Sequence, residues 1–236
     1  MRRFAETMTW AEDRGFAIDA AVGERMGFIR RTYSHLLAEL FGVALVTAIT
    51  ISIPSLLSLA EGLMWSSYIV YLAVFIGLSL LTRSMLAGDK PIGTQYTAAG
   101  LWVVALGFLC APLVNWVAGS QGFGPVWSAF VLTACVFTGL TAYVFFTKKD
   151  FSFLGGALSM ITLGVIGFIL MGSLFGFTGG SFMTLFIVIL FGGWILYDTS
   201  QVLHRRHTNQ YVSASVELLI DFVLMFIHIL SLLSRD

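Results

Sequence analysis

Two aspartates in the last quarter of the chain stand inside apolar segments, where a charged group is costly. Asp198 lies in GGWILYDTS, and Asp221 lies in VELLIDFVLMFIHIL. A carboxylate near the middle of a bilayer costs about 3 kcal/mol or more, so such residues usually face a protein interior and serve a function. This pair is therefore the first candidate for chemistry in the sequence.

Glu217 and His228 share the last apolar segment with Asp221. At about 100° per residue, the three positions fall within a sector of about 40° on a helix. They predict one polar stripe on an otherwise apolar helix. Two interpretations stay open for Glu217, a protonated acid that only joins helices or a member of a functional cluster. His228 is more typical of a satisfied polar residue than of a proton relay.

The composition places these residues in a membrane protein. Of 236 residues, 58% are hydrophobic and 11% are charged, whereas soluble domains carry about 25% charged residues. The net charge is zero and no basic patch indicates nucleic acid. Cys110 and Cys135 lie in apolar runs, so we expect neither a disulfide nor a metal site. We also expect no cofactor.

Hydrophobic runs of about 20 residues predict transmembrane helices. The sequence has a charged N-terminal arm at 1–31, followed by a transmembrane domain at 32–236. This all-α domain is predicted to have seven spans, near 32–53, 63–82, 92–111, 126–147, 153–174, 182–203 and 212–233. The predicted breaks on one side are 54–62, 112–125 and 176–180, and we interpret Gly172, Gly176 and Gly180 as a helix-packing seam.

Basic residues predict the orientation of the spans. Twelve of the 13 Lys and Arg residues fall in the N-terminal arm or in alternate connections, and Arg235 is the exception. The positive-inside rule makes that side cytoplasmic, so the N-terminus is expected inside and the C-terminus outside. The alternative is a re-entrant last segment, with both ends of the chain inside.

Depth along the helices predicts which acids can meet. At about 1.5 Å per residue, Asp198 lies about 10 Å from the basic turn that follows it. On the same scale Glu217 and Asp221 lie about 9 and 15 Å from the start of their segment, and Glu39 lies about 12 Å from the basic end of the arm. Because helices joined by a short turn are usually neighbours, we expect Asp198 to face the stripe of Glu217 and Asp221. Glu39 either joins this cluster or reaches back to the interface.

Several motifs resemble those of the Bax-inhibitor family, also called the transmembrane Bax inhibitor motif family. They are LYDTSQVLH at 196–204, ELLIDFVLMFIHILSLL at 217–233, KKDFSFLGGAL at 148–158 and the segment KPIGTQYTAAG. The resemblance covers nearly all of residues 25–236 and is to the bacterial inner-membrane branch.

This resemblance implies seven helices, with the last one central and surrounded by the other six. It also implies a pH-sensitive calcium leak, in which aspartates matching Asp198 and Asp221 share a proton as a gate. One bacterial branch is instead known to modulate a membrane-bound ATP-dependent protease. The chain departs from some channel-type members because its second span has no acid, although Arg83 matches a basic position. Glu39 or Glu217 would have to replace that missing carboxylate.

Three functions are compatible with these residues. The leading one is a cation leak controlled by Asp198 and Asp221, with calcium favoured because it prefers oxygen ligands. The second is a non-transporting regulator that binds a membrane protease or another membrane partner. The third, an intramembrane aspartyl protease, would suit paired aspartates. However, residues 218–220 before Asp221 lack the Gly-x-Gly of such sites, so we expect no enzyme. The oligomeric state is left open.

Overall fold

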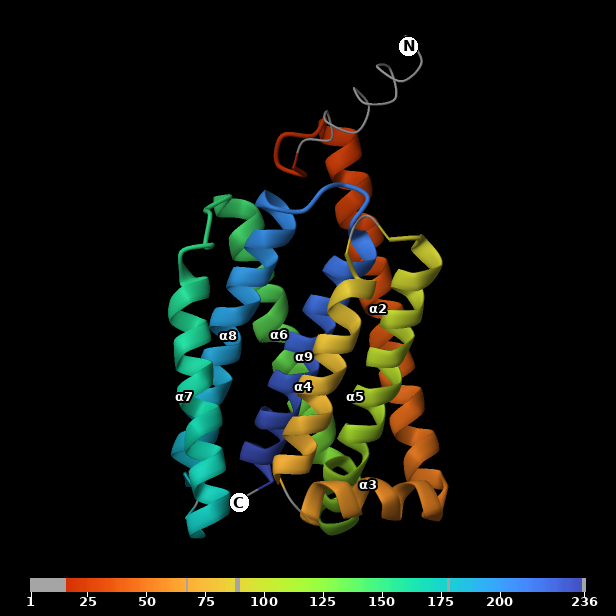
Figure 1. Cartoon of the computed structure of the whole chain (residues 1–236), viewed down its shortest axis with the longest axis vertical. Helices are drawn as coiled ribbons and strands as arrows, with labels where there is room; N and C mark the ends of the chain where they lie inside the picture. The colour runs from red at the N-terminus through yellow and green to blue at the C-terminus, as the bar shows by residue number, and fades with distance from the viewer. Residues whose placement is uncertain (1–15, 67, 88–89, 178, 235–236) are drawn as a thin grey trace.

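The computed structural model describes residues 16–66, 68–87, 90–177 and 179–234 (Figure 1). Within these ranges the regular elements are all helices, which confirms the all-α prediction. They are α2 (Val22–Ser52), α3 (Pro54–Ser66), α4 (Tyr68–Met85), α5 (Ile92–Gln121), α6 (Gly124–Thr147), α7 (Leu154–Phe175), α8 (Gly180–His204) and α9 (Tyr211–Leu233).

Six of the described helices, α2 and α5 to α9, are long and apolar enough to cross a membrane. The part of α4 from Leu72 to Met85 is a shorter apolar helix. Six of the predicted spans therefore fall on these six helices, whereas the second covers the end of α3 and most of α4. Residues 1–15 of the predicted arm lie outside the described residues, and 22–31 are the first turns of α2.

The segment predicted as a loop after Pro54 is a helix. Ile53 is extended (φ −111°, ψ 104°), and α3 begins at Pro54 itself. Proline is favoured at the first helical position because its fixed φ suits the helix and its missing N–H is not needed there. Figure 1 shows α3 lying across the end of the bundle. Pro54 thus ends one helix and begins the next.

The break predicted at 112–125 is shorter than expected, because α5 continues through Pro112 to Gln121. A proline inside a membrane helix removes one backbone hydrogen bond, which neighbouring helices make tolerable. The helix ends at Gly122, which has φ 77° and donates its N–H to the Ala118 carbonyl (3.1 Å). A left-handed residue of this kind is favourable only for glycine.

The interpretation of the spaced glycines as a packing seam was wrong for Gly176. This residue ends α7 with φ 74°, and its N–H donates to the Gly172 carbonyl (2.8 Å). A Cβ added to Gly176 would meet nothing within 4 Å. Gly180 also has a positive φ of 59°. These two glycines therefore form the turn between α7 and α8 rather than a contact between helices.

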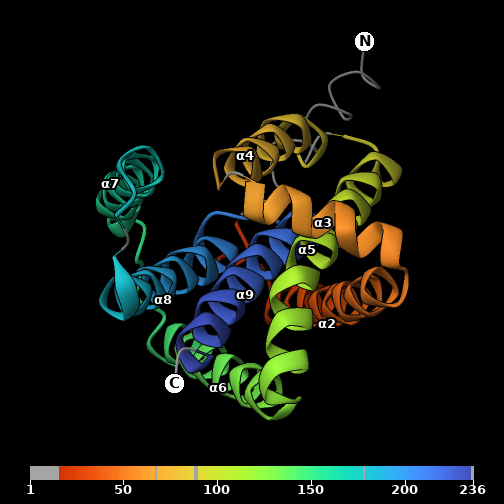
Figure 2. The same cartoon turned by 90° about the horizontal axis from the view of Figure 1, so that it is seen from below.

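The last helix runs beside α2, α5, α6 and α8, as the view along the bundle shows (Figure 2). Buried side chains occur along most of its length, and the largest fully buried ones are Leu218, Leu219, Met225 and Leu230. Polar groups among these buried residues need partners from neighbouring helices.

The basic residues of the described chain gather at one end of the bundle. They lie in the first turns of α2, at the end of α4, and in the α4–α5, α6–α7 and α8–α9 connections. Figure 1 shows those connections at the end where the chain begins, opposite α3.

Replacing Gly176 with alanine should destabilise the protein. A left-handed conformation costs a residue with a Cβ about 1–2 kcal/mol, so Gly176→Ala should lower the thermal unfolding midpoint in detergent by several degrees. Gly119→Ala is the matched control, because Gly119 lies inside α5 with nothing within 4 Å of an added Cβ. Equal midpoints for the two variants would mean that the φ of Gly176 carries no cost.

Candidate functional site

The structure brings Asp198 and Asp221 together between α8 and α9. The two helices are antiparallel neighbours joined by residues 205–210. The two carboxyl groups lie within hydrogen-bonding reach of each other. Asp221 is 5% exposed and Asp198 is half-buried. Two carboxyl groups attract each other only when one of them carries a proton, because two carboxylates are both acceptors and both negative.

Glu217 extends this pair toward the basic end of the bundle. It lies one turn before Asp221 on α9 and close enough to both aspartates to act on them electrostatically. Its carboxylate forms an ion pair with Arg206, from the turn between α8 and α9. The second oxygen of Glu217 and one oxygen of Asp221 are buried without a protein partner.

Arg206 is a member of this cluster that the sequence did not predict, because no helical spacing relates it to Glu217 in the next helix. In the sequence it counts only among the basic residues of the connections. The one available signal was a basic residue in a short turn before a helix that carries an acid near its start. Its side chain is 25% exposed and that of Glu217 is 33% exposed. Partly exposed ion pairs contribute about 0–1 kcal/mol, so this pair alone holds Arg206 weakly.

Glu39 contacts α9 but does not join the aspartates. One of its oxygens accepts a hydrogen bond from the Ser215 hydroxyl (2.8 Å), and the other is buried without a partner. Ser215 and Glu217 are two residues apart on α9, which places them about 160° apart around the helix. The contact of Glu39 is therefore on another side of α9, where it joins α2 to α9.

The other two predicted supporting residues lie apart from the acids. Arg83 is exposed in the last turn of α4 and forms no ion pair with any described residue. His228 donates from Nδ1 to the Leu224 carbonyl of its own helix (2.7 Å), and its ring packs against Phe191 (5.4 Å). This is the satisfied polar residue that the sequence favoured.

His228 nevertheless shares a cavity with Asp221. The cavity has a volume of about 410 Å³ and is lined by residues of α4, α7, α8 and α9. Most of its lining is apolar, with Ser79 and Thr162 as further polar residues. The polar stripe predicted on α9 thus begins at Glu217, passes Asp221 and continues along a cavity wall to His228.

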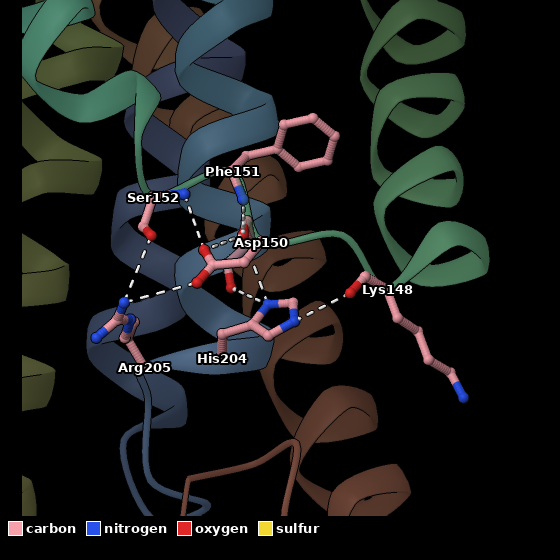
Figure 3. A network of polar contacts seen from close by, with 7 residues as sticks. Lys148, Asp150, Phe151, Ser152, His204 and Arg205 are labelled. Carbon is pink, nitrogen blue, oxygen red and sulfur yellow. Dashed lines mark hydrogen bonds and ion pairs between the residues drawn. The ribbon is translucent and has the colours of Figure 1, made fainter.

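A second polar network lies where the end of α8 meets the α6–α7 connection (Figure 3). The Ser200 hydroxyl accepts a hydrogen bond from the Phe151 N–H (2.8 Å) and donates to Asp150 (3.5 Å). The ring of His204 donates from Nε2 to the Lys148 carbonyl (3.2 Å). The segments 148–158 and 196–204, which are distant in sequence, therefore fasten the α6–α7 connection to α8.

Asp150 is the charged member of this network. The hydroxyl and backbone N–H of Ser152 donate to its carboxylate, and with His204 and Arg205 nearby they lower its pKa. Because the pKa of Asp150 is lower in the folded protein than in the unfolded chain, its ionised carboxylate stabilises the fold. This stabilisation is present above the unfolded pKa of about 3.9 and is lost as the pH falls through the folded pKa. Asp150 consequently stays ionised across neutral pH.

Comparison with known proteins assigns the family. The family described as "Inhibitor of apoptosis-promoting Bax1" matches residues 25–236. An uncharacterized protein of Pseudomonas aeruginosa is 28% identical over 94% of this chain and 96% of its own length. A BI1-like protein of Arabidopsis thaliana is 31% identical over 89% of this chain and 81% of its own, and Bax inhibitor 1 of Schizosaccharomyces pombe is 29% identical over 91% and 79%.

The chain is therefore a member of the Bax-inhibitor family. Its apolar helices and this membership make it an integral membrane protein. The Pseudomonas relative is consistent with a bacterial branch.

Removing the Ser200 hydroxyl should loosen the connection between α6 and α7. In Ser200→Ala the Phe151 N–H loses its acceptor, and an unsatisfied buried donor costs about 1–3 kcal/mol. The thermal unfolding midpoint in detergent should fall accordingly. The control is Ser159→Ala, because the exposed Ser159 hydroxyl bonds only to its own helix at Gly155 (2.7 Å). A midpoint for Ser200→Ala as high as that of the control would contradict the role given to this hydroxyl.

Proposed function

We propose that this protein is a pH-sensitive cation leak pathway, with calcium as the transported ion, and that it is not an enzyme. The observation that carries the proposal is the approach of Asp198 and Asp221 to hydrogen-bonding reach between two apolar helices. The family resemblance supports it, because it implies a shared-proton gate at these two positions. Glu217 extends the same acidic surface, whereas Glu39 and Arg83 lie outside it.

The gate works through one proton. With the proton present, the two carboxyl groups form a hydrogen bond that joins α8 to α9. Without it, two unit charges about 4 Å apart repel each other by about 4 kcal/mol at an effective dielectric constant near 20. The hydrogen bond between a carboxylic acid and a carboxylate is charge-assisted and contributes about 1.5–3 kcal/mol, so the repulsion is the larger effect. Raising the pH would therefore separate the helices and leave a negative, cation-attracting surface.

The ion pathway would follow the polar stripe of α9. The cavity of about 410 Å³ leads from His228 to Asp221. Beyond Asp221 lie Asp198 and then Glu217, nearest the basic end of the bundle. Carboxylate oxygens are the ligands that calcium prefers. The route thus joins an apolar cavity to three acids in sequence.

The membrane arrangement is part of the same proposal. Taking α4 as a span gives seven transmembrane helices with α9 central among them. The basic end of the bundle is cytoplasmic by the positive-inside rule, in a bacterial inner membrane. Under this arrangement a reporter fused after Asp236 should be active outside the cytoplasm. Cytoplasmic activity of the reporter would contradict the seven-span topology.

The alternative is a non-transporting regulator that binds a membrane-bound ATP-dependent protease or another membrane partner through the N-terminal arm. Residues 1–15, the outer part of that arm, lie outside the described residues. Deleting residues 1–15 should abolish co-purification of such a partner if the alternative holds. The described contacts of the arm are with the α8–α9 turn of its own chain.

Mutating either aspartate should flatten the pH dependence of calcium flux. In Asp198→Asn or Asp221→Asn the remaining acid has no like-charged neighbour with which to share a proton, so the coupled titration is lost. The double variant should behave like each single variant, because all three remove the same switch. The measurement is calcium uptake into liposomes that contain purified protein, across the neutral pH range.

Asp150→Asn is the control for this experiment. Asp150 is an acid near the same end of α8, but its lowered pKa keeps it ionised at neutral pH. Its removal should leave the pH midpoint unchanged. A wild-type profile in either aspartate variant would show that the pair only joins the helices, and uptake no greater than that of empty vesicles would exclude the leak itself.

A further inference from the structure

The chain folds back on itself where the N-terminal arm meets the turn between α8 and α9. Phe16 and His207 form an isolated antiparallel bridge, in which the N–H of Ala17 donates to the Arg206 carbonyl (2.8 Å). The rings of Phe16 and His207 stack with centroids 5.2 Å apart, and Ala17 is fully buried. Segments about 190 residues apart in sequence are thus joined by backbone and side-chain contacts.

A second attachment holds the other side of the same turn. The hydroxyl of Thr208 donates to Glu24 at the start of α2 (2.6 Å). Arg25 donates to the carbonyl of Ile18 (3.1 Å), which holds the short loop between the bridge and α2 in place. Residues 16–24, here called the N-terminal clasp, therefore contact the α8–α9 turn at Arg206, His207 and Thr208.

The turn that the clasp holds is the one that carries Arg206. The backbone carbonyl of Arg206 accepts from the clasp, while its guanidinium forms the ion pair with Glu217. Because a partly exposed ion pair is weak, the backbone contacts hold the turn from which the Arg206 side chain reaches Glu217. Glu217 lies on the polar stripe between Asp221 and the basic end, so Arg206 covers the acids on that side.

We propose that Arg206 is a second, inner gate of the ion pathway, and that the N-terminal clasp sets its position. Arg206 places a positive charge at Glu217, where a cation on the pathway would otherwise be attracted. Releasing the clasp frees the turn, and Arg206 then leaves Glu217. Closure on this side depends on the contact between arm and turn, whereas closure deeper in the bundle depends on the shared proton. The inference rests on the proposed leak function.

The position of Arg206 can be measured without any transport assay. An arginine-specific dicarbonyl reagent, read out by mass spectrometry, should label Arg206 slowly in the intact chain because the ion pair protects it. Phe16→Ala removes the ring stacking, and Ala17→Pro removes the N–H that bonds to the Arg206 carbonyl. Both variants should label several-fold faster at Arg206. Labelling of Arg205, whose side chain is 55% exposed, should not change.

The same variants test the gate by calcium uptake into liposomes at the alkaline end of the wild-type pH profile, where the shared proton is lost and the deeper closure is open. Phe16→Ala, Ala17→Pro and Arg206→Gln should each raise uptake several-fold, and adding Phe16→Ala to Arg206→Gln should raise it no further. Asp19→Asn is the control, because Asp19 is exposed and lies in the clasp without contacting the turn. It should behave as wild type in both assays.

A crosslink tests the converse, that fastening the N-terminal clasp to the turn closes the inner gate. This test does not require a variant with a loosened clasp to fold normally. Phe16→Cys with His207→Cys places two thiols at a bridged pair, in a chain where Cys110 and Cys135 are replaced by alanine. Oxidation should lower calcium uptake below that of the reduced protein, and reduction should restore it.

The outcomes separate the two proposals. Unchanged labelling of Arg206 in both clasp variants would overturn the clasp, whatever the flux. Faster labelling with unchanged uptake, in vesicles where the wild type conducts, would overturn the inner gate. If no form of the protein conducts, the leak function and the gate fail together, while the labelling still decides whether the clasp positions Arg206.

Discussion

The contact between two carboxyl groups, those of Asp198 and Asp221, is the interaction on which the account of this protein depends. In a largely dry interior the pair is attractive with one proton and strongly repulsive with none. The antiparallel α8 and α9 place the acids at a common depth, and the apolar burial of α9 keeps water away from Asp221. Under the proposed function, the separation of these two helices depends on a single proton.

The polar contacts at the basic end of the bundle support this pair from outside. Ser200 and His204 fasten the end of α8 to the α6–α7 connection, so that end of α8 is fixed by contacts other than the acids. Arg206 neutralises Glu217 in the following turn. The supporting side chains of Ser200, His204 and Arg206 all follow Asp198 within eight residues of the chain.

The helices and the approach of Asp198 to Asp221 could be predicted because they follow from periodicity, span length and a short connection. Contacts made by flexible turns could not be predicted, since no repeat relates Arg206 to Glu217. Glu39 shares the depth of the aspartates but contacts another side of α9, and depth arithmetic carries no information about rotation between distant helices. Spacing likewise did not reveal that Gly176 adopts a positive φ.

The most direct test of the central claim is to observe the shared proton itself. Infrared difference spectra of the protein in lipid, recorded across neutral pH, resolve the carbonyl stretch of a protonated carboxyl group from that of a carboxylate. The account predicts one protonated-carboxyl band that disappears as the pH rises, and that shifts or is lost from this pH range in both Asp198→Asn and Asp221→Asn. The absence of such a band in the wild type, or a band unaffected by both substitutions, would contradict it.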